Sequence, residues 1–117
     1  MNQVQQNCIF CRIQSGEFPA KKLYEDEHFF IIADIEPKAK YHYLAIPKSH
    51  YATLDKMTKK SQESIGHIFK TIASLKQQLC LQNGYRLIIN QGEDAGQTVF
   101  HLHIHIMAGQ KMDFPHF

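Results

Sequence analysis

The sequence predicts an α+β domain built on an antiparallel sheet of about five strands, with one long helix and one short helix. Five short segments rich in aliphatic, β-branched or aromatic residues are bounded by polar, glycine or proline positions, as strands are. One longer segment instead repeats its apolar residues at three- and four-residue steps, which is typical of a helix. Most strands are joined by short links, and the 117 residues contain no internal repeat or linker, so we expect a single domain over residues 1–117.

The first half of the chain is predicted to hold the short helix and three strands. Asn7 is the expected cap of a helix over residues 8–15, and Gly16 is its stop signal. The strands are expected at Lys22–Tyr24, Phe29–Ala33 and Tyr43–Pro47. His42 lies just before the third strand, and the sequence assigns it no role.

The second half is predicted to hold the long helix and two further strands. Thr58 or Ser61 opens the helix and Asn83-Gly84 closes it. Its apolar face consists of Ile65, Ile68, Phe69, Ile72, Leu75 and Leu79. The last two strands are expected at Tyr85–Asn90 and Val99–Met107, on either side of a polar, glycine-containing loop over residues 91–97.

Composition excludes several classes of protein. Hydrophobic residues make up 44% and charged residues 21%, which is ordinary globular composition, and the net charge of +2 is too small to indicate a polyanion-binding protein. No apolar run approaches the roughly 18 residues of a membrane span, and the polar start lacks the features of a signal peptide. Three cysteines, an odd number, do not suggest a disulfide framework. We therefore expect a cytoplasmic protein with no nucleic-acid or membrane partner.

The most informative segment is the last predicted strand, because it carries three alternating histidines. On a strand His101, His103 and His105 share one face, while the aliphatic residues between them point to the other. Histidine clusters serve either metal ligation or acid–base and nucleophilic catalysis. The loop over residues 92–98 offers backbone amides to an anion, and a neutral imidazole beside an anion site is suited to attacking phosphorus.

These residues resemble the histidine triad (HIT) family, whose signature is three histidines alternating with apolar residues and followed by two apolar positions. Residues 101–107 (HLHIHIM) fit that signature at all seven positions. Further family landmarks are FCRIQSGEFP at 10–19, Asp34-Ile35, LAIPKSH at 44–50 and Asn90-Gln91-Gly92. The ending GQKMDFP at 109–115 resembles the Hint branch in particular.

The resemblance implies a catalytic role for several positions. His103 matches the family nucleophile, which forms a covalent nucleotidyl-histidine intermediate that water then hydrolyses. His105 matches a residue that hydrogen-bonds the phosphate oxygens. Thr98 stands where the Hint branch has a hydroxyl near the leaving group, and Gln97 and Val99 offer backbone amides beside it.

The resemblance also implies a purine nucleotide site. Asp34 matches the carboxylate that receives the ribose hydroxyls, and Asn90 matches a polar group on the ribose–phosphate side. An apolar slot for the purine is implied at Ile9, Phe10, Ile13, Ile32 and Ile35. A carboxylate suits a vicinal diol because it accepts two hydrogen bonds, and an aliphatic slot discriminates little between adenine and guanine.

The pair Cys8-x-x-Cys11 is open to three interpretations: a redox pair, a metal knuckle or a coincidence. Two thiolates and two imidazoles form a common zinc set, although spacing alone does not choose the imidazoles. Zinc-bearing HIT relatives pair such a motif with the histidine of Pro-Lys-x-His and the first triad histidine, here His50 and His101. The resemblance thus implies a structural zinc ion, and it places His101 among the ligands as well as in the catalytic triplet.

Taken together, the sequence predicts a homodimeric hydrolase that releases a purine nucleoside monophosphate from phosphoramidates. The alternatives are a dinucleoside polyphosphate hydrolase of the Fhit type and a nucleotide- or partner-binding module without catalysis. The Fhit type favours a polar residue just after the triad, whereas Met107-Ala108-Gly109 supplies none before Gln110.

Overall fold

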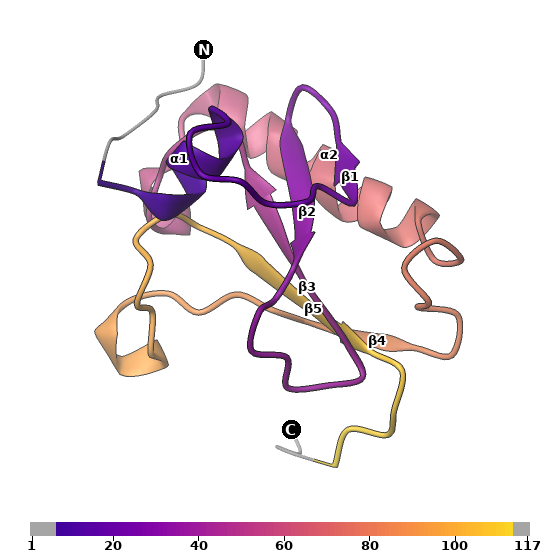
Figure 1. Ribbon diagram of the computed structural model, residues 1–117. Helices are drawn as coiled ribbons and strands as arrows, with labels where there is room; N and C mark the ends of the chain where they lie inside the picture. Colours follow the sequence, from indigo (N-terminus) through magenta and orange to yellow (C-terminus); the bar gives the residue numbers. More distant parts are fainter. Residues whose placement is uncertain (1–6, 114–117) are drawn as a thin grey trace.

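The computed structural model describes residues 7–113, so residues 1–6 and the Phe114-Pro115 part of the family resemblance lie outside the described residues. Within this range the elements follow one another as α1 (Ile9–Gln14), β1 (Tyr24–Glu25), β2 (Phe29–Ala33), β3 (Tyr41–Pro47), the 3-10 turn η1 (Leu54–Lys56), α2 (Lys59–Ser74), β4 (Tyr85–Ile88), the 3-10 turn η2 (Glu93–Ala95) and β5 (Ile104–Ala108) (Figure 1). The strands form one antiparallel sheet in the order β1-β2-β3-β5-β4. The predicted α+β class is confirmed.

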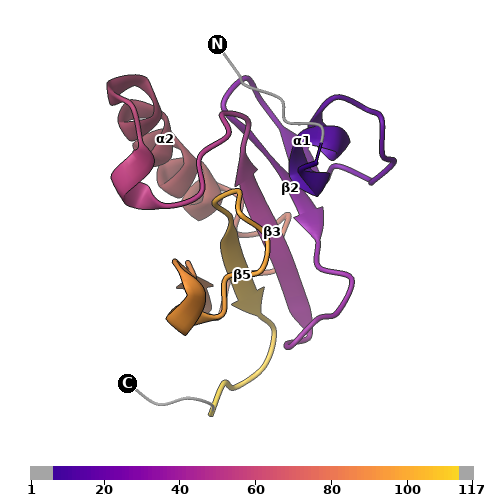
Figure 2. The ribbon, with the colours of Figure 1, turned by 90° about the vertical axis from the view of Figure 1, so that its left-hand side faces the viewer.

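The two α-helices cover opposite faces of the sheet (Figure 2). Alternate residues of a strand point to opposite faces, so Phe29 and Ile31 of β2 join the core cluster under α2. Phe30 and Ile32 join a second cluster under α1. Both faces of β2 are buried, which explains why its sequence is a continuous apolar run rather than an alternating one.

The strand β5 divides its side chains between these two faces. Ile104 and Ile106 are fully buried in the cluster under α2. His105 points to the opposite face, where it is the register partner of Leu44, a residue of the cluster under α1. The histidine side chains of the signature segment therefore lie on the α1 side of the sheet.

The start of β5 differs from the sequence prediction. The strand begins at Ile104, and residues 99–103 run outside the sheet ladder. The backbone N–H of Leu102 donates instead to the carbonyl oxygen of Tyr51 at 2.7 Å, so this stretch pairs with the segment that follows β3. Consequently His101 lies outside the strand that carries His105. Smaller differences are found at β1, β3 and β4, whose expected bounds were 22–24, 43–47 and 85–90.

The helix α2 opens as expected and ends earlier. The hydroxyl of Thr58 accepts a hydrogen bond from the N–H of Ser61 at 3.2 Å and caps the first turn. The helix ends at residue 74, and residues 75–80 form turns in which Leu75 and Leu79 remain buried. Phe69, expected on the apolar face, is 38% exposed. No helix within the described range has the length and apolar character needed to cross a membrane.

Candidate active site and metal centre

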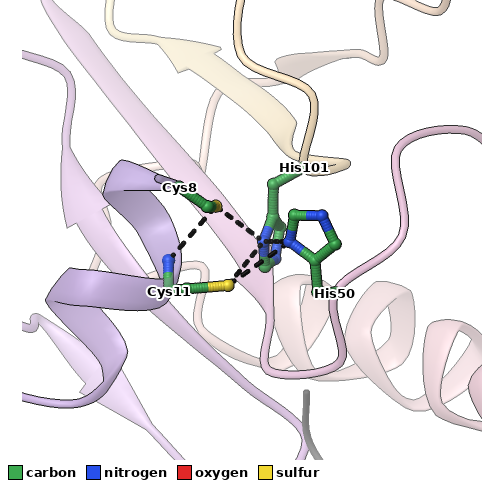
Figure 3. Close-up of side chains that lie close together, drawn as sticks. All are labelled: Cys8, Cys11, His50 and His101. Atoms are coloured by element: carbon green, nitrogen blue, oxygen red, sulfur yellow. Dashed lines mark hydrogen bonds between the residues drawn. The ribbon is translucent and has the colours of Figure 1, made fainter. Parts of the chain in front are cut away.

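Two thiols and two imidazoles meet beside α1 (Figure 3). Cys8 caps the helix and Cys11 lies in its first turn, so the x-x spacing brings both sulfurs to the same helix end. His50 follows β3, and His101 precedes β5. The Sγ of Cys11 lies 3.3 Å from Nδ1 of His50, and the two imidazole Nδ1 atoms are 3.1 Å apart. Nδ1 of His101 is 3.4 Å from Sγ of Cys8 and 3.6 Å from Sγ of Cys11.

Apart from the slightly shorter Nδ1–Nδ1 separation, these distances fit a closed tetrahedral zinc site. Zn–S bonds of about 2.3 Å and Zn–N bonds of about 2.0–2.1 Å place tetrahedral ligand atoms roughly 3.3–3.8 Å apart. Nε2 of His101 donates to the carbonyl oxygen of Pro47 at 2.7 Å, which leaves Nδ1 with the lone pair that faces the thiols. Burial lowers the pKa of His101 to about 4 and that of His50 below its usual value. Both rings are thus held in the neutral form that ligates metals.

The candidate nucleophile, His103, lies next to this cluster and is only partly buried. A ring nitrogen facing a carbonyl oxygen must be the donor, and Nδ1 of His103 lies 2.8 Å from the carbonyl oxygen of His101. In the neutral ring the lone pair is therefore on Nε2. The ring of Phe10 packs edge-on against His103, with centroids 5.1 Å apart, and fixes the plane of the imidazole.

A hydrogen-bonded chain of two histidines lies on the other side of the site. The backbone N–H of Lys38 donates to Nδ1 of His42 at 2.9 Å. His42 is therefore neutral and carries its proton on Nε2, which lies 2.9 Å from Nδ1 of His105 and donates to it. The proton of a neutral His105 must then sit on Nε2, where it can be donated to an anion. Burial is the main cause that lowers the pKa of both rings, that of His105 to about 4.

Sequence reasoning missed His42. The signal that could have found it is alternation along β3, which puts His42 on the same face as Leu44 and Ile46. That face is also the face of His105, but only the pairing of β3 with β5 reveals it. The order of strands in the sheet is not readable from either strand alone.

Asp34 lies beside this chain, and the ligand atoms of Asp34, His42 and His105 are close enough together to form a second candidate metal cluster. Oδ2 of Asp34 is 3.4 Å from Nε2 of His42 and 3.9 Å from Nδ1 of His105. The hydrogen bond from Lys38 excludes a metal ligand at His42 Nε2, because a ring that accepts at Nδ1 keeps its proton on Nε2. The cluster is better explained as a chain of hydrogen bonds that orients His105.

A cavity of about 450 Å³ brings most of the predicted site residues together. Its lining includes Phe10, Asp34, Asn90, Gln97, Thr98, Val99, His103 and His105. Within it, Oδ1 of Asp34 accepts the N–H of Glu36 at 2.8 Å, which fixes the carboxylate at the end of β2. With Glu36 and Lys38, which also line it, the cavity combines two imidazoles, two carboxylates, an ammonium group and an aromatic ring, a donor and acceptor set that suits a nucleotide.

The loop before the histidines is fixed by the side chain of Gln97. Its Oε1 accepts the N–H of Gly92 at 2.8 Å, and its Nε2 donates to the carbonyl oxygens of Ala52 at 2.8 Å and Val99 at 3.3 Å. Gly96 adopts the left-handed conformation (φ 80°) that closes the η2 turn. Gln97 is buried and acts as a brace, while Thr98 stays exposed at the rim of the cavity.

The predicted apolar slot is only partly assembled along this cavity. Phe10 lines it, whereas Ile13 and Ile32 are buried in the cluster under α1. Ile35 is 95% exposed. Ile9 lines a neighbouring cavity that does not include His103.

Comparisons with known proteins agree with this geometry. The model of the HIT domain matches residues 15–112, so the chain belongs to the HIT family. A histidine triad protein from Clostridium difficile is 40% identical, with a TM-score of 0.89, over 98% of this chain and 99% of that one. A HIT family hydrolase from Legionella pneumophila is 38% identical, with a TM-score of 0.86, over 93% and 98%. A zinc-bound histidine triad family protein from Mycobacterium smegmatis is 37% identical, with a TM-score of 0.77, over 95% and 81%.

Proposed function

We propose that this chain is a nucleotide hydrolase of the Hint branch that releases a purine nucleoside monophosphate from phosphoramidates through a nucleotidyl-histidine intermediate. The observation that carries the proposal is the hydrogen bond from Nδ1 of His103 to the carbonyl oxygen of His101 at 2.8 Å. It leaves the lone pair of His103 on Nε2, and His103 lines the cavity together with Asp34 and His105. Sequence and structural similarity to a protein described as a HIT family hydrolase supports hydrolysis as the reaction class.

In the proposed reaction, Nε2 of His103 forms a bond to phosphorus as the bond to the leaving amine breaks. The amine takes up a proton from the solvent as it leaves, and water then attacks the intermediate, which releases the nucleoside monophosphate and the neutral histidine and returns the protons of the water to the solvent. The proton on Nε2 of His105 and the hydroxyl of Thr98 stabilise the charge that develops on the phosphate oxygens and the leaving group. The backbone amides of Gln97 and Val99 are the further donors that we assign to this charge.

We assign the nucleoside to the part of the cavity that contains Asp34 and Phe10. The carboxylate of Asp34 accepts the ribose hydroxyls, and Asn90 binds on the ribose–phosphate side. Of the five apolar residues expected around the purine, we assign the contact to Phe10, which lines the cavity, and to the exposed Ile35, since Ile13 and Ile32 are buried under α1 and Ile9 lines the neighbouring cavity. In this assignment the exposed side chain of Ile35 is covered when the base binds.

We further propose that Cys8, Cys11, His50 and His101 hold a structural zinc ion. The donor set, the ligand spacing and the lone pair on Nδ1 of His101 support this, as does the zinc-bound relative. Bound zinc would tie the N-terminal segment to the sheet and fix the backbone of His101, and hence the acceptor that orients His103. The remaining proposals are a homodimer, formed as in the Hint branch, and residence in the cytoplasm without nucleic-acid or membrane partners.

The test is release of AMP from adenosine 5′-phosphoramidate by the purified zinc-loaded protein. We expect turnover by the wild type and none by His103→Ala, which should still bind AMP. His67→Ala is the matched control, because His67 is an exposed histidine of α2 that contacts Asp26 rather than the cavity. A mass spectrum of the wild type quenched during turnover should show one added nucleotidyl group.

The same assay separates the rival functions. Faster release of AMP from diadenosine polyphosphates than from the phosphoramidate would favour the Fhit type. Nucleotide binding without turnover of either substrate would favour a binding module. Retained turnover by His103→Ala would refute the proposed nucleophile.

A further inference from the structure

The two cysteines of the metal cluster differ in how far the solvent can reach them. Cys8 lines a cavity of about 360 Å³ whose lining also includes Asn7 and Phe100. Asn7 and Phe100 are both exposed, so the cavity can be entered from the solvent. Cys11, in contrast, is 0% exposed. A small oxidant that enters the cavity therefore meets Cys8 first.

The two sulfurs are close enough to react with each other (Figure 3). All four ligand atoms of the cluster, the two sulfurs included, lie within 4.8 Å of one another. The N–H of Cys11 also donates to Sγ of Cys8 at 3.4 Å. The two-residue spacing is that of the dithiol motifs that form reversible disulfides. Spacing alone leaves both a redox pair and a metal knuckle open for Cys8 and Cys11, and the geometry is compatible with both.

The two imidazoles of the cluster border the hydrogen bond that holds the backbone at the candidate nucleophile. The N–H of Leu102 donates to the carbonyl oxygen of Tyr51 at 2.7 Å. His50 directly precedes Tyr51, and His101 directly precedes Leu102. The carbonyl of His101 belongs to the same peptide unit as the N–H of Leu102, and it accepts the hydrogen bond of His103. A metal bound by both imidazoles would therefore cross-link the same two segments as this backbone bond.

The buried ring of His101 depends on the two thiols for a partner. Its Nε2 donates to a backbone carbonyl, so its Nδ1 carries the lone pair and faces Sγ of Cys8 at 3.4 Å and Sγ of Cys11 at 3.6 Å. A disulfide has no S–H to donate and no thiolate charge to hold a metal beside this nitrogen. The other ring nitrogen near it is Nδ1 of His50 at 3.1 Å. After oxidation, either His50 must donate through this atom or the ring of His101 must move, because a buried acceptor without a partner is unfavourable.

We propose that Cys8 and Cys11 form a redox switch in which a hydroperoxide oxidises both thiolates to a disulfide, the metal leaves and turnover falls. The inference rests on the proposed zinc site and the proposed function. With hydrogen peroxide, Sγ of Cys8 forms a bond to one oxygen as the O–O bond breaks and hydroxide leaves. Sγ of Cys11 then attacks the resulting sulfenic acid, forms the S–S bond and displaces a second hydroxide. Two electrons pass from the thiolates to the peroxide, and two protons from the solvent convert the hydroxides to water.

The first experiment follows zinc and sulfur and does not depend on turnover. The zinc-loaded wild type is treated with hydrogen peroxide, zinc release is followed with a colorimetric chelator, and the mass of the chain is measured. We expect zinc release together with a peptide in which Cys8 and Cys11 are cross-linked and two hydrogens are lost. Dithiothreitol and zinc should reverse both changes. Cys80→Ser is the matched control and should respond like the wild type, because Cys80 lies outside the cluster.

The order of the two steps is tested in the same wild-type protein. Dimedone, which traps sulfenic acids, is added together with the peroxide, and the labelled peptides are identified by mass spectrometry. We expect the label on Cys8, which lines the cavity, and none on the buried Cys11. Label on Cys11 in the folded protein would contradict entry of the oxidant at Cys8.

The second experiment measures hydrolysis of adenosine 5′-phosphoramidate by the same samples. We expect kcat to fall by about tenfold or more in the disulfide form, as for loss of other groups that support an active site, and to return after reduction with zinc. Disulfide formation with zinc loss and unchanged kcat would show that the pair does not control the nucleophile. Retention of zinc with both thiols reduced, or irreversible oxidation of Cys8 without a disulfide, would refute the switch.

These outcomes are distinguishable from failure of the proposals on which the inference rests. A wild type that binds no zinc would refute the proposed metal site before any oxidant is added. A zinc-loaded wild type without turnover would refute the proposed function, while zinc release and the mass of the chain would still report whether the cysteine pair is oxidised reversibly.

Discussion

Nδ1 of His103 donates to the backbone carbonyl oxygen of His101, and the ring of the same His101 belongs to the Cys2His2 cluster. One residue therefore contributes a side chain to the candidate metal centre and a main-chain acceptor to the candidate nucleophile. The candidate metal centre and the candidate nucleophile are therefore coupled through the main chain of His101, whose carbonyl oxygen accepts the hydrogen bond of His103. Any change that moves the ring of His101 should also turn the imidazole of His103.

The first prediction follows from this coupling. Replacing both Cys8 and Cys11 by Ser should abolish bound zinc and lower the melting temperature by roughly 10 °C, because loss of a ligand that binds only the folded state removes its contribution to stability. Turnover should fall as well, since the acceptor of His103 loses its anchor. Elemental analysis and thermal unfolding measure the two effects.

The matched control for this experiment is Cys80→Ser, which changes the same side chain outside the cluster. It should keep the metal content of the wild type. An unchanged zinc content in the double variant would show that the thiols do not hold the metal.

The second prediction concerns His42 as a positioning residue. His42→Asn keeps an acceptor near the N–H of Lys38 but removes the donor to His105, whereas His42→Gln keeps a donor near the position of Nε2. Loss of a supporting hydrogen bond of this kind costs roughly 10–100-fold in activity. We expect kcat to fall by about that factor in His42→Asn, with little change in KM, and to be partly restored in His42→Gln.

If His42 had a purely structural role, kcat would fall by the same factor in His42→Asn and His42→Gln. Thermal unfolding of the two proteins provides the comparison, and equal melting temperatures with unequal kcat values support the positioning role. Equal kcat values in both variants would contradict it.

The histidines show how much of this site could be predicted from the sequence. Alternation correctly places His105 opposite the aliphatic core residues of β5, because alternation is a property of the strand backbone. The face assignment also holds for His101, whose ring contacts Phe10 on the α1 side, but the strand assignment does not, because the chain leaves the ladder before Ile104 and the His101 ring bonds to the carbonyl of Pro47. That contact joins residues 54 positions apart, and no local pattern encodes it.

The strand and helix bounds likewise include some that the local sequence predicts and one that it does not. The bounds of β2 were predicted without error because both of its faces are buried and the whole run is apolar. The end of α2 was placed too late, because the leucines at 75 and 79 continue the apolar period through turns that are not helical. The burial of these two leucines was predicted correctly, whereas their helical backbone conformation was not.

The third prediction concerns the dependence of stability on pH. Burial alone would raise the pKa of Asp26, but hydrogen bonds from His67, from the backbone N–H groups of His28 and Phe29 and from the hydroxyl of Tyr24 lower it to about 2. A carboxylate whose pKa is depressed in the folded state stabilises the protein above its unfolded pKa of about 3.9. That contribution is lost as the pH falls through about 2.

Urea unfolding of wild type and Asp26→Asn should therefore show the wild type more stable at neutral pH and the difference shrinking between about pH 4 and pH 2. Asp94→Asn, which substitutes an exposed aspartate in η2, outside the group of residues that hydrogen-bond Asp26, is the matched control. A difference independent of pH over this range would mean that the carboxylate is not held ionised by these hydrogen bonds.

The fourth prediction compares two buried tyrosines. The hydroxyl of Tyr51 has no hydrogen-bond partner within the described residues, and burial raises its pKa to about 12. The hydroxyl of Tyr43 donates to the carbonyl oxygen of Leu79 at 2.8 Å. Tyr51→Phe should raise the free energy of unfolding by about 1 kcal/mol, because it removes a buried polar group that is not hydrogen-bonded. Tyr43→Phe should lower it by about 1 kcal/mol, because it removes a donor and leaves a buried carbonyl behind. Urea unfolding measures both changes, and a loss of stability in Tyr51→Phe as large as that in Tyr43→Phe would show that the Tyr51 hydroxyl is bonded in solution.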